Sequence, residues 1–298
     1  MKRRDFLKTA FLGVITFALN KVDSFGSSPS LYPDLVVAKG ERPCMLVRSA
    51  ILALGGMSRF VSRGDVVVIK PNIGWDRTPE MAANTNPDVV AELIRLCYEA
   101  GAKLVKVFDR SVNDPRRCYV QSGIEKAATS AGGKVIYPDD RKFKRVDIRG
   151  ETLKSWEIST DVLEADKVIN VPIAKHHSLA GLTMSIKNLM GVMGGFRGLI
   201  HQRLDDSLAD LAAFIRPALT VLDATRVLVR GGPQGGDLRN VVKMDTIIAG
   251  VDQVAVDAYG ATLFGIRPED IGHIKKAAMR GVGKMDIDRM RIRRLSPK

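Results

Sequence analysis

Residues 166–195 read DKVINVPIAKHHSLAGLTMSIKNLMGVMGG, and this stretch decides the predicted fold. Its apolar run at 168–171 has the length and the β-branched content of a buried strand, which Pro172 ends. A polar turn is expected next, and a helical pattern follows it. Five side chains capable of chemistry lie in these two segments: Lys175, His176, His177, Lys187 and Asn188. Open α/β sheets bind ligands at the carboxyl ends of their strands, so the stretch predicts one wall of a ligand site.

Strand-like and helical segments alternate along the rest of the chain. Strands are expected at residues 35–38, 65–70, 104–108, 134–137, 219–223 and 246–249. Helices are expected at residues 45–54, 87–100, 123–131, 207–215, 252–264 and 268–280. Continuous β-branched runs, such as the one at 66–69, suit strands that are covered on both faces. We therefore predict an α/β fold, a Rossmann-like and mostly parallel sheet with helices on both faces.

Two further features complete the predicted organisation. Residues 143–159 alternate in polarity around a turn, which predicts a small antiparallel hairpin insertion. Residues 27–298 have the length of one α/β domain, and a division into lobes at 27–160 and 161–298 is the alternative.

The composition points to an anionic partner. The chain carries 46 Lys and Arg residues against 33 Asp and Glu residues, a formal net charge of +13. Such a charge favours an acidic small molecule, a phosphate, a membrane surface or nucleic acid. Nucleic acid is disfavoured, because the chain shows neither a recognised binding module nor a basic stripe with interleaved aromatic residues. The basic tail at 289–298 is expected to be a solvated surface.

The first residues resemble a targeting signal. Residues 2–8 read KRRDFLK, which is similar to a twin-arginine signal, and an apolar run at 10–19 follows. We therefore predict a signal segment at 1–26, the twin-arginine translocase as a partner, and a periplasmic or membrane-associated extracytoplasmic location. The sequence Ser24-Phe25-Gly26 is a poor cleavage site, so membrane contact through an uncleaved signal is an alternative.

Polar residues follow four predicted strands at their carboxyl ends. They are Lys70 with Asn72, Asp109, the segment 175–177, and Asp223. Because the carboxyl ends of parallel strands share one edge of a sheet, we expect these side chains to line a common cleft. Each also has a structural alternative. Lys70 can be a surface lysine, and Asp109 or Asp223 can cap the turn that follows it.

Three residues are predicted to carry acid/base or nucleophilic chemistry: Lys70, His177 and Lys187. Histidine suits acid/base catalysis because its unperturbed pKa is about 6.5. A lysine among apolar helix neighbours must extend to solvent, form a pair or lower its pKa, and a lowered pKa makes Lys187 a base or a nucleophile. The predicted ligand contacts are Asn72, Asp109, Lys175, His176, Asn188, Asp223, Gly232 and Pro233.

Two further ligand types follow from residue chemistry. The glycine-rich turn at 230–236 can present backbone amides to an anion. The candidate ligands for a divalent metal ion are His176, His177 and Asp109. The sequence leaves the identity of a metal or other cofactor open.

Several segments together resemble the family called domain of unknown function 362 (DUF362). They are VVIKPN at 67–72, VINVP at 168–172 with the Lys-His-His segment, KNLMG at 187–191, Gly232-Pro233, and AGVD at 249–252 followed by Val256-Asp257. The resemblance implies no established activity, although many members carry an iron–sulfur module. The cysteines at positions 44, 97 and 118 are too far apart for a cluster in this chain, so a redox partner protein is the implied alternative.

A second resemblance is to the nickel-pincer lactate racemases. It is carried by Ala165-Asp166, His177, Ala180-Gly181 and Lys187. The resemblance implies acid/base chemistry by His177 on an α-hydroxy acid and cofactor attachment at Lys187. Ser185-Ile186 stands where that family has two glycines, a departure that bears on the attachment.

The predicted function is binding of a small anionic ligand, with acid/base or racemase-like chemistry. The alternatives are a non-catalytic extracytoplasmic binding or maturation protein and a redox accessory to an iron–sulfur partner.

Overall fold

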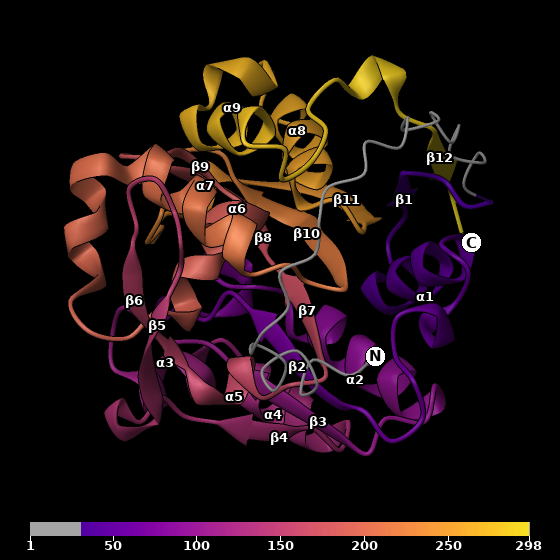
Figure 1. Cartoon of the computed structure of the whole chain (residues 1–298). Helices are drawn as coiled ribbons and strands as arrows, with labels where there is room; N and C mark the ends of the chain where they lie inside the picture. The colour runs from indigo at the N-terminus through magenta and orange to yellow at the C-terminus, as the bar shows by residue number, and fades with distance from the viewer. Residues whose placement is uncertain (1–30, 298) are drawn as a thin grey trace, which may run out of the picture.

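The computed structural model describes residues 31–297 and confirms the predicted α/β class. The predicted signal segment at 1–26 lies outside the described residues. Eight strands follow one another across the main sheet in the order β12-β1-β11-β10-β7-β2-β3-β4 (Figure 1). Their bounds are β1 Leu35–Lys39, β2 Val66–Pro71, β3 Leu104–Phe108, β4 Lys134–Ile136, β7 Lys167–Val171, β10 Leu219–Leu228, β11 Val241–Gly250 and β12 Ile292–Leu295.

The sheet is mostly parallel, as predicted. The five neighbouring strands β10, β7, β2, β3 and β4 run in one direction. Strand β11 runs antiparallel to both of its neighbours, β10 and β1. The chain moves outward from β2 through β3 to β4 on one side, and from β7 to β10 on the other. The boundary between β2 and β7 is therefore the topological switch point, where open α/β sheets bind ligands.

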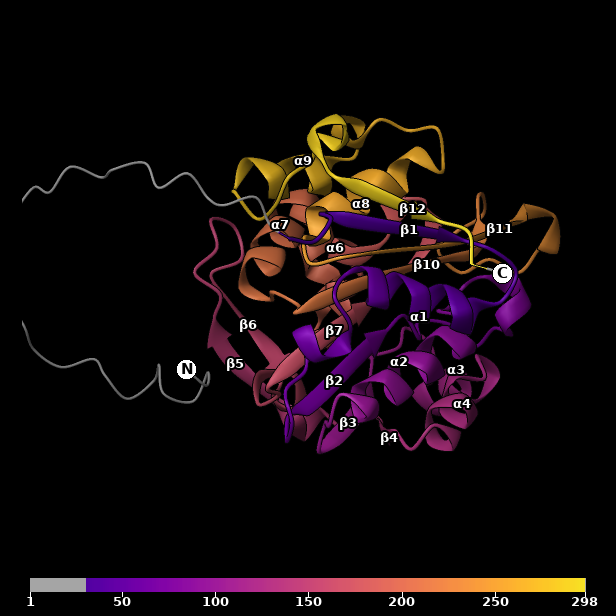
Figure 2. The same ribbon diagram turned by 90° about the vertical axis from the view of Figure 1, so that its right-hand side faces the viewer.

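Helices cover both faces of the sheet, and Figure 2 shows α8 and α9 on one side of the strands with α1 and α2 on the other. The helix bounds are α1 Pro43–Ala53, α2 Pro87–Glu99, α3 Pro115–Gln121, α4 Ile124–Ser130, α5 Thr160–Leu163, α6 Ser185–Asn188, α7 Leu204–Phe214, α8 Gln253–Thr262 and α9 Gly272–Met279. Side chains of β2 alternate between the two cores. Val67 and Ile69 pack toward α1 and α2, whereas Val68 packs toward α7 and α8. This double burial explains the unbroken apolar run.

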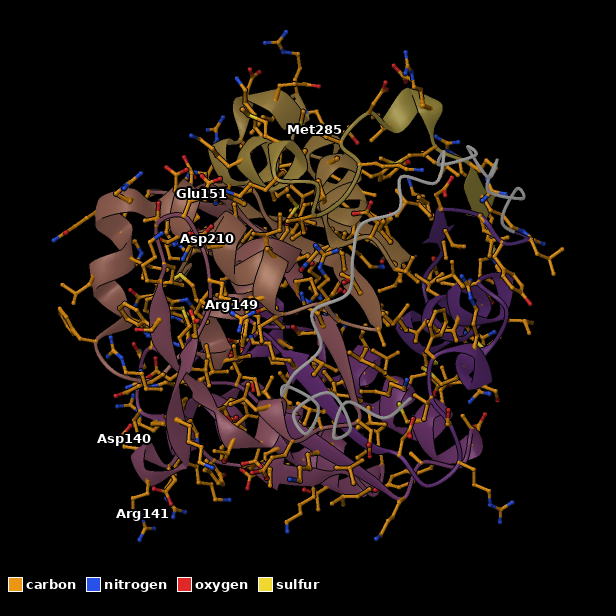
Figure 3. All side chains as sticks on the ribbon, in the orientation of Figure 1. Asp140, Arg141, Arg149, Glu151, Asp210 and Met285 are labelled. Atoms are coloured by element: carbon orange, nitrogen blue, oxygen red, sulfur yellow. The ribbon has the colours of Figure 1, made fainter. Side chains whose placement is uncertain are left out.

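The predicted hairpin insertion is present as strands β5 (Phe143–Asp147) and β6 (Ser155–Ser159). Asp210 of α7 fixes the loop between these strands. Its carboxylate accepts hydrogen bonds from the backbone amides of Glu151, Thr152 and Leu153 at 3.1, 2.8 and 2.8 Å. Figure 3 shows Glu151 and Asp210 near each other beneath α9. The insertion is thereby tied to the body of the domain.

Two predictions about local structure are wrong, and one strand was not predicted. Residues 173–177 form strand β8 (Ile173–His177) instead of a polar turn, because they pair with β10 and with β9 (Gly181–Thr183). The helix expected around Lys187 is the single turn α6, followed by a 3-10 helix at Leu189–Val192. The basic tail contains strand β12, which pairs with β1 at the edge of the sheet.

Candidate functional site

A cavity of about 530 Å³ opens at the carboxyl ends of β2, β3 and β8. It lies beside the switch point between β2 and β7. Predicted site residues that line it are Lys70, Asn72, Asp109, Lys175, His177, Lys187, Asn188 and Pro233. The cavity volume falls within the range of small-molecule sites, which is about 300–1,000 Å³.

Asn188 joins the strands beneath the cavity. Its side-chain oxygen accepts hydrogen bonds from Lys70 Nζ at 2.9 Å and from Asn72 Nδ2 at 3.0 Å. Its amide nitrogen donates to Asn170 Oδ1 at 2.8 Å and to the carbonyl of Lys70 at 3.2 Å. Lys70 and Asn170 are opposite each other in the β2–β7 register. Asn188 therefore uses its full hydrogen-bonding capacity to hold α6 against both strands.

Lys70 is fully partnered. Its ammonium forms an ion pair with Asp109 Oδ1 at 2.7 Å and donates to Asn188 and to the carbonyl of Pro71 at 2.9 and 2.8 Å. Both side chains of the ion pair are buried. Burial lowers the pKa of Lys70, and the charge of Asp109 opposes that shift. With two hydrogen-bond acceptors and an ion-pair partner, Lys70 supports the floor of the cavity and balances the charge of Asp109.

Gly191 lies directly against this ion pair. A Cβ atom at this position would meet the carboxylate of Asp109 and approach Lys70 Nζ to 2.6 Å. The carbonyl of Gly191 also accepts a hydrogen bond from the amide of Arg110 at 2.9 Å. The ion pair and the loop after β3 can therefore pack this closely because position 191 lacks a side chain.

Lys175 is buried with two partners. Its ammonium donates to Asn72 Oδ1 at 2.9 Å and to the carbonyl of Ala83 at 2.6 Å. Burial lowers the pKa of Lys175 to about 7, and the positive charges of Lys187 and Lys70 add to the shift, which Asp109 opposes. One N–H group of the ammonium is left for a ligand.

Lys187 has the weakest partner of the three lysines. Its amine donates to the sulfur of Met190 at 2.9 Å, and no carboxylate of the described residues lies within ion-pair distance. Burial lowers the pKa of Lys187 to about 8, and the positive charge of Arg197 adds to the shift. A thioether is a weak acceptor, so this amine is the one most available to a ligand.

Asp257 of α8 positions the turn that carries Lys187. Its carboxylate accepts hydrogen bonds from the amides of Ser185 and Ile186 at 2.6 and 2.9 Å, the first two residues of α6. Burial raises the pKa of Asp257 to about 8, and the two amide hydrogen bonds oppose the shift. Asp257 thus anchors the start of α6, as Asn188 anchors its end.

The hydrogen bonds of His177 determine which nitrogen of its ring carries the proton, and the sequence alone does not show this. Its Nδ1 accepts hydrogen bonds from the backbone amides of Leu179 and Ala180 at 3.1 and 3.2 Å. The proton of the neutral ring therefore resides on Nε2. Burial lowers the pKa of His177 to about 3, and the positive charges of Lys187 and Lys175 add to the shift. At neutral pH the ring is a hydrogen-bond donor, which differs from the expected group titrating near pH 6.5.

The structure places three predicted ligand contacts outside the cavity lining. Asp223 is buried, and its carboxylate accepts from the amide of Asn86 at 2.8 Å and from the amide and hydroxyl of Thr225 at 2.9 and 2.7 Å. His176 Nδ1 accepts from the amide of Gly232 at 3.2 Å. These residues hold loops together, and Pro233 alone of the expected glycine-rich turn reaches the cavity.

The candidate metal ligands are already engaged with the protein. Asp109 faces Lys70 and also accepts from the amide of Ile73 at 2.6 Å, while each of the two histidines uses Nδ1 as an acceptor. Among residues 31–297, no group of three His, Cys, Asp or Glu side chains is arranged to hold a metal ion. The predicted set therefore does not form a metal site in this arrangement.

Sequence reasoning missed several residues of the site. Arg197 lines the cavity, and its guanidinium donates to the carbonyls of Arg110 and Ser111, both at 2.7 Å. His201 and the buried Asn170 were also not singled out. Asp257 lay inside a segment that carried the family resemblance, and this was the one available signal for it. Asn170 lay in the VINVP segment of the same resemblance, and nothing in the local sequence marks Arg197 or His201.

The arrangement has the components for binding an anion and moving a proton. Five cationic side chains line the cavity: Lys70, Arg110, Lys175, Lys187 and Arg197. Among the described lining residues Asp109 is the one carboxylate, and it is paired with Lys70. A lysine with a pKa of about 8 is partly neutral near pH 7.5 and is therefore a competent base. The Nε2–H of His177 can donate to developing negative charge.

The fold and the cavity define a class: an α/β protein with a cation-rich ligand cavity at the switch point of a mostly parallel sheet. The chain belongs to the DUF362 family, because the family model described as "Domain of unknown function (DUF362)" matches residues 67–262. The family resemblance seen in the sequence is thereby confirmed. The matched region contains all of the lining residues described above.

The chain is also similar to individual known proteins. The chain is 28% identical over 233 residues to the "Thylakoid-associated protein sll1697" of Synechocystis sp., covering 76% of this chain and 71% of that protein. A lactate racemase apoprotein from Thermoanaerobacterium thermosaccharolyticum is a structural neighbour, with 12% identity and a TM-score of 0.40 over 82% of this chain. A protein from Thermotoga maritima gives 10% identity and a TM-score of 0.43 over 76% of this chain. The chain spans 56% and 60% of those two structures.

Proposed function

We propose that the cavity binds a small anionic ligand and that Lys187 exchanges a proton with it. The charge balance of the cavity carries the proposal. Lys70 pairs with Asp109 and Arg110 pairs with Asp140, whereas the three other cationic side chains have no ion-pair partner among the described residues: Lys175, Lys187 and Arg197. Buried cations without counter-ions raise the free energy of the ligand-free protein. An anion that enters the cavity supplies the missing charge.

The proposed chemistry is proton transfer at a carbon or a hydroxyl group of the ligand. The free N–H of Lys175 and the cations around it hold the anionic group. The neutral form of Lys187 takes the proton, and the Nε2–H of His177 donates to the charge that develops. An α-hydroxy acid is the substrate class that this arrangement suits, in keeping with the racemase-like motif around His177 and Lys187.

Proton uptake on binding tests the anion site. An anion favours the charged forms of Lys175 and Lys187 and raises both pKa values, so binding at pH 8 takes protons from the buffer. Calorimetric titrations with acetate, lactate and inorganic phosphate, each in two buffers of different ionisation enthalpy, measure this uptake. Binding without proton uptake would contradict the proposal.

Two lysine variants give the matched comparison. Lys187→Ala is expected to weaken acetate binding at least tenfold and to reduce proton uptake. Lys134→Ala removes an exposed lysine at the start of β4 and is expected to change neither. Equal loss in both variants would mean that the general positive charge of the protein, and not the cavity, attracts the anion.

A non-catalytic binding protein is the second candidate. The ion pair of Lys70 with Asp109 and the four hydrogen bonds of Asn188 favour it, because a rigid floor suits recognition without chemistry. Incubation with lactate in D2O separates the two functions. A catalyst exchanges the Cα hydrogen, seen as a loss of its proton NMR signal, whereas a binder leaves that signal unchanged.

We also propose that the protein is exported by the twin-arginine translocase and acts outside the cytoplasm. The motif at residues 2–8 supports this. No helix within residues 31–297 is long and apolar enough to cross a bilayer. Cell fractionation of the full chain and of an Arg3→Lys, Arg4→Lys variant tests the route, and accumulation of both forms in the same fraction would contradict it. Co-purification with an iron–sulfur protein from that fraction would instead support the redox-accessory role.

A further inference from the structure

Exposed apolar side chains surround the mouth of the cationic cavity. Val112, Leu179 and Phe196 line the cavity, and 59%, 71% and 76% of their respective surfaces are exposed. They come from three separate segments: the loop after β3, the turn between β8 and β9, and the segment before the 3-10 helix Arg197–Arg203. Three large apolar residues at one opening form a patch, which soluble proteins tend to keep for binding.

The apolar surface extends from the mouth in two directions. Inward, Trp75, Met190 and Pro233 line the same cavity as the lysines. Outward, Phe196 also lines a neighbouring hollow of about 270 Å³, whose other lining residues are apolar or small (Trp156, Gly195 and the half-exposed Leu199) except for the charged Arg145 and Glu157. The cationic interior and the apolar mouth therefore belong to one continuous surface.

The size of the cavity exceeds the needs of a three-carbon acid. Its volume of about 530 Å³ is in the range that holds drug-sized ligands. A short acid placed against the lysines would leave the apolar mouth in contact with water. Burial of apolar surface is the main favourable term in binding, so a ligand that also covers the mouth gains affinity.

We propose that the ligand is amphipathic, with an anionic head group, carboxylate or phosphate, and an apolar chain or ring of at least five or six carbons. The head group contacts Lys175 and Lys187, and the apolar part lies between Leu179, Phe196 and Val112. This inference rests on the proposed anion site and defines the ligand class of that site.

A homologous ligand series tests the inference with the full-length protein. The ligands are acetate, butanoate, hexanoate and octanoate, with the matching alkyl phosphates and with hexanol as the neutral analogue. Each methylene that becomes buried is expected to strengthen binding about fourfold. Hexanol is expected to bind at least tenfold more weakly than hexanoate. Comparison of carboxylates with phosphates identifies the preferred head group.

Two mouth variants and one control complete the test. Leu179→Ser and Phe196→Ser are expected to weaken octanoate binding about threefold to tenfold and to leave acetate binding unchanged. Leu52→Ser alters a residue of α1 with 74% exposure that is not among the lining residues, and it is expected to change neither affinity. Because all three side chains are exposed, the substitutions should not disturb folding.

The outcomes separate the two proposals. Equal affinity for acetate and octanoate, with both lost in Lys187→Ala, would overturn the amphipathic ligand and keep the anion site. Failure of every carboxylate and phosphate to bind would overturn the anion site itself. Sedimentation with phosphatidylglycerol vesicles tests a lipid surface as the occupant of the mouth. If Phe196→Ser lowers vesicle binding but not octanoate affinity, the inference is wrong.

Discussion

Two clusters of ionisable side chains in this domain, one partly exposed and one buried in the cavity, differ in their balance of charge. In the α7–α9 cluster, Arg280 forms ion pairs with Asp206, Asp210 and Glu151 at 3.0, 3.0 and 3.1 Å. In the cavity, Lys187 has a thioether sulfur as its partner. The first cluster has a counter-ion for its cation, whereas the second has cations in excess. A cation that is surrounded by counter-ions therefore does not mark a ligand site, whereas a buried cation without a counter-ion does.

The largest expected effect is on the stability of the balanced cluster. Asp210→Ala removes one of the three carboxylates around Arg280 and leaves three loop amides without their acceptor, so it should lower the free energy of unfolding by about 3–5 kcal/mol. Urea denaturation followed by circular dichroism measures the change. Arg141→Ala removes the 90% exposed partner of Asp139 and should leave the urea midpoint unchanged. A similar midpoint in both variants would show that the α7–α9 cluster contributes nothing.

A substitution of Asp223 tests whether this carboxylate stabilises the fold or binds the ligand. Asp223→Asn places an amide group against donors from Asn86 and Thr225, and it should cost about 1–3 kcal/mol of stability. The affinity for acetate should stay the same, because the side chain is not among those lining the cavity. Denaturation and calorimetry on the same sample measure both quantities. If Asp223→Asn lost acetate affinity in proportion to its loss of stability, Asp223 would have to be counted as a ligand contact.

Substitution of Lys187 should have the opposite effects: a gain in stability and a loss of acetate binding. Lys187→Met replaces a buried ammonium that lacks a counter-ion with an apolar chain of similar length, so the ligand-free protein should gain about 1–2 kcal/mol of stability at pH 7. The same variant should lose acetate binding. Lys134→Met on the exposed end of β4 serves as the control and should alter neither property. A destabilised Lys187→Met protein would mean that the lysine is structural.

The smallest expected effect is a dependence of stability on pH. The pKa of Lys187 is about 8 in the folded protein and about 10.4 in the unfolded chain, so the unfolded state binds more protons between these values. Its destabilising contribution is complete below pH 7 and fades as the pH rises. Between pH 7 and pH 9 the wild-type protein should therefore gain about 1 kcal/mol relative to Lys187→Met. If the difference in stability between the wild-type protein and Lys187→Met stayed constant from pH 7 to pH 9, the lowered pKa of Lys187 would be contradicted.

Periodicity predicted the sheet, and eight of the eleven site residues expected from the sequence line the cavity. Runs such as 66–69 are apolar on both faces, and this property is local, so the strands were visible in the sequence. Strand β8 was missed because its Lys-His-His segment looks polar, although pairing with β9 and β10 buries two of its three polar side chains. Strand β12 was missed because two arginines interrupt its apolar residues.

Protonation states and partners could not be predicted from local sequence. The ring of His177 is fixed by two backbone amides of the following turn, and these have no sequence signature. Asp223 ends the strand predicted at 219–223, as a ligand contact would, but β10 continues to Leu228 and the carboxylate accepts a hydrogen bond from Asn86, a distant part of the chain. Such contacts exist only after the strands have been assembled.

The single turn α6 has a consequence for how Lys187 meets a ligand. The carboxylate of Asp257 accepts hydrogen bonds from the first two amides of α6. Asn188, the last residue of α6, is hydrogen-bonded to β2 and β7, so both ends of this four-residue helix are fixed. A lysine on a surface helix loses rotamer freedom when it binds, which weakens affinity by about 0.5–1.5 kcal/mol for such a side chain. Here that loss has occurred during folding. The amine therefore acts as a rigid receptor, and the arriving ligand has to adopt its geometry.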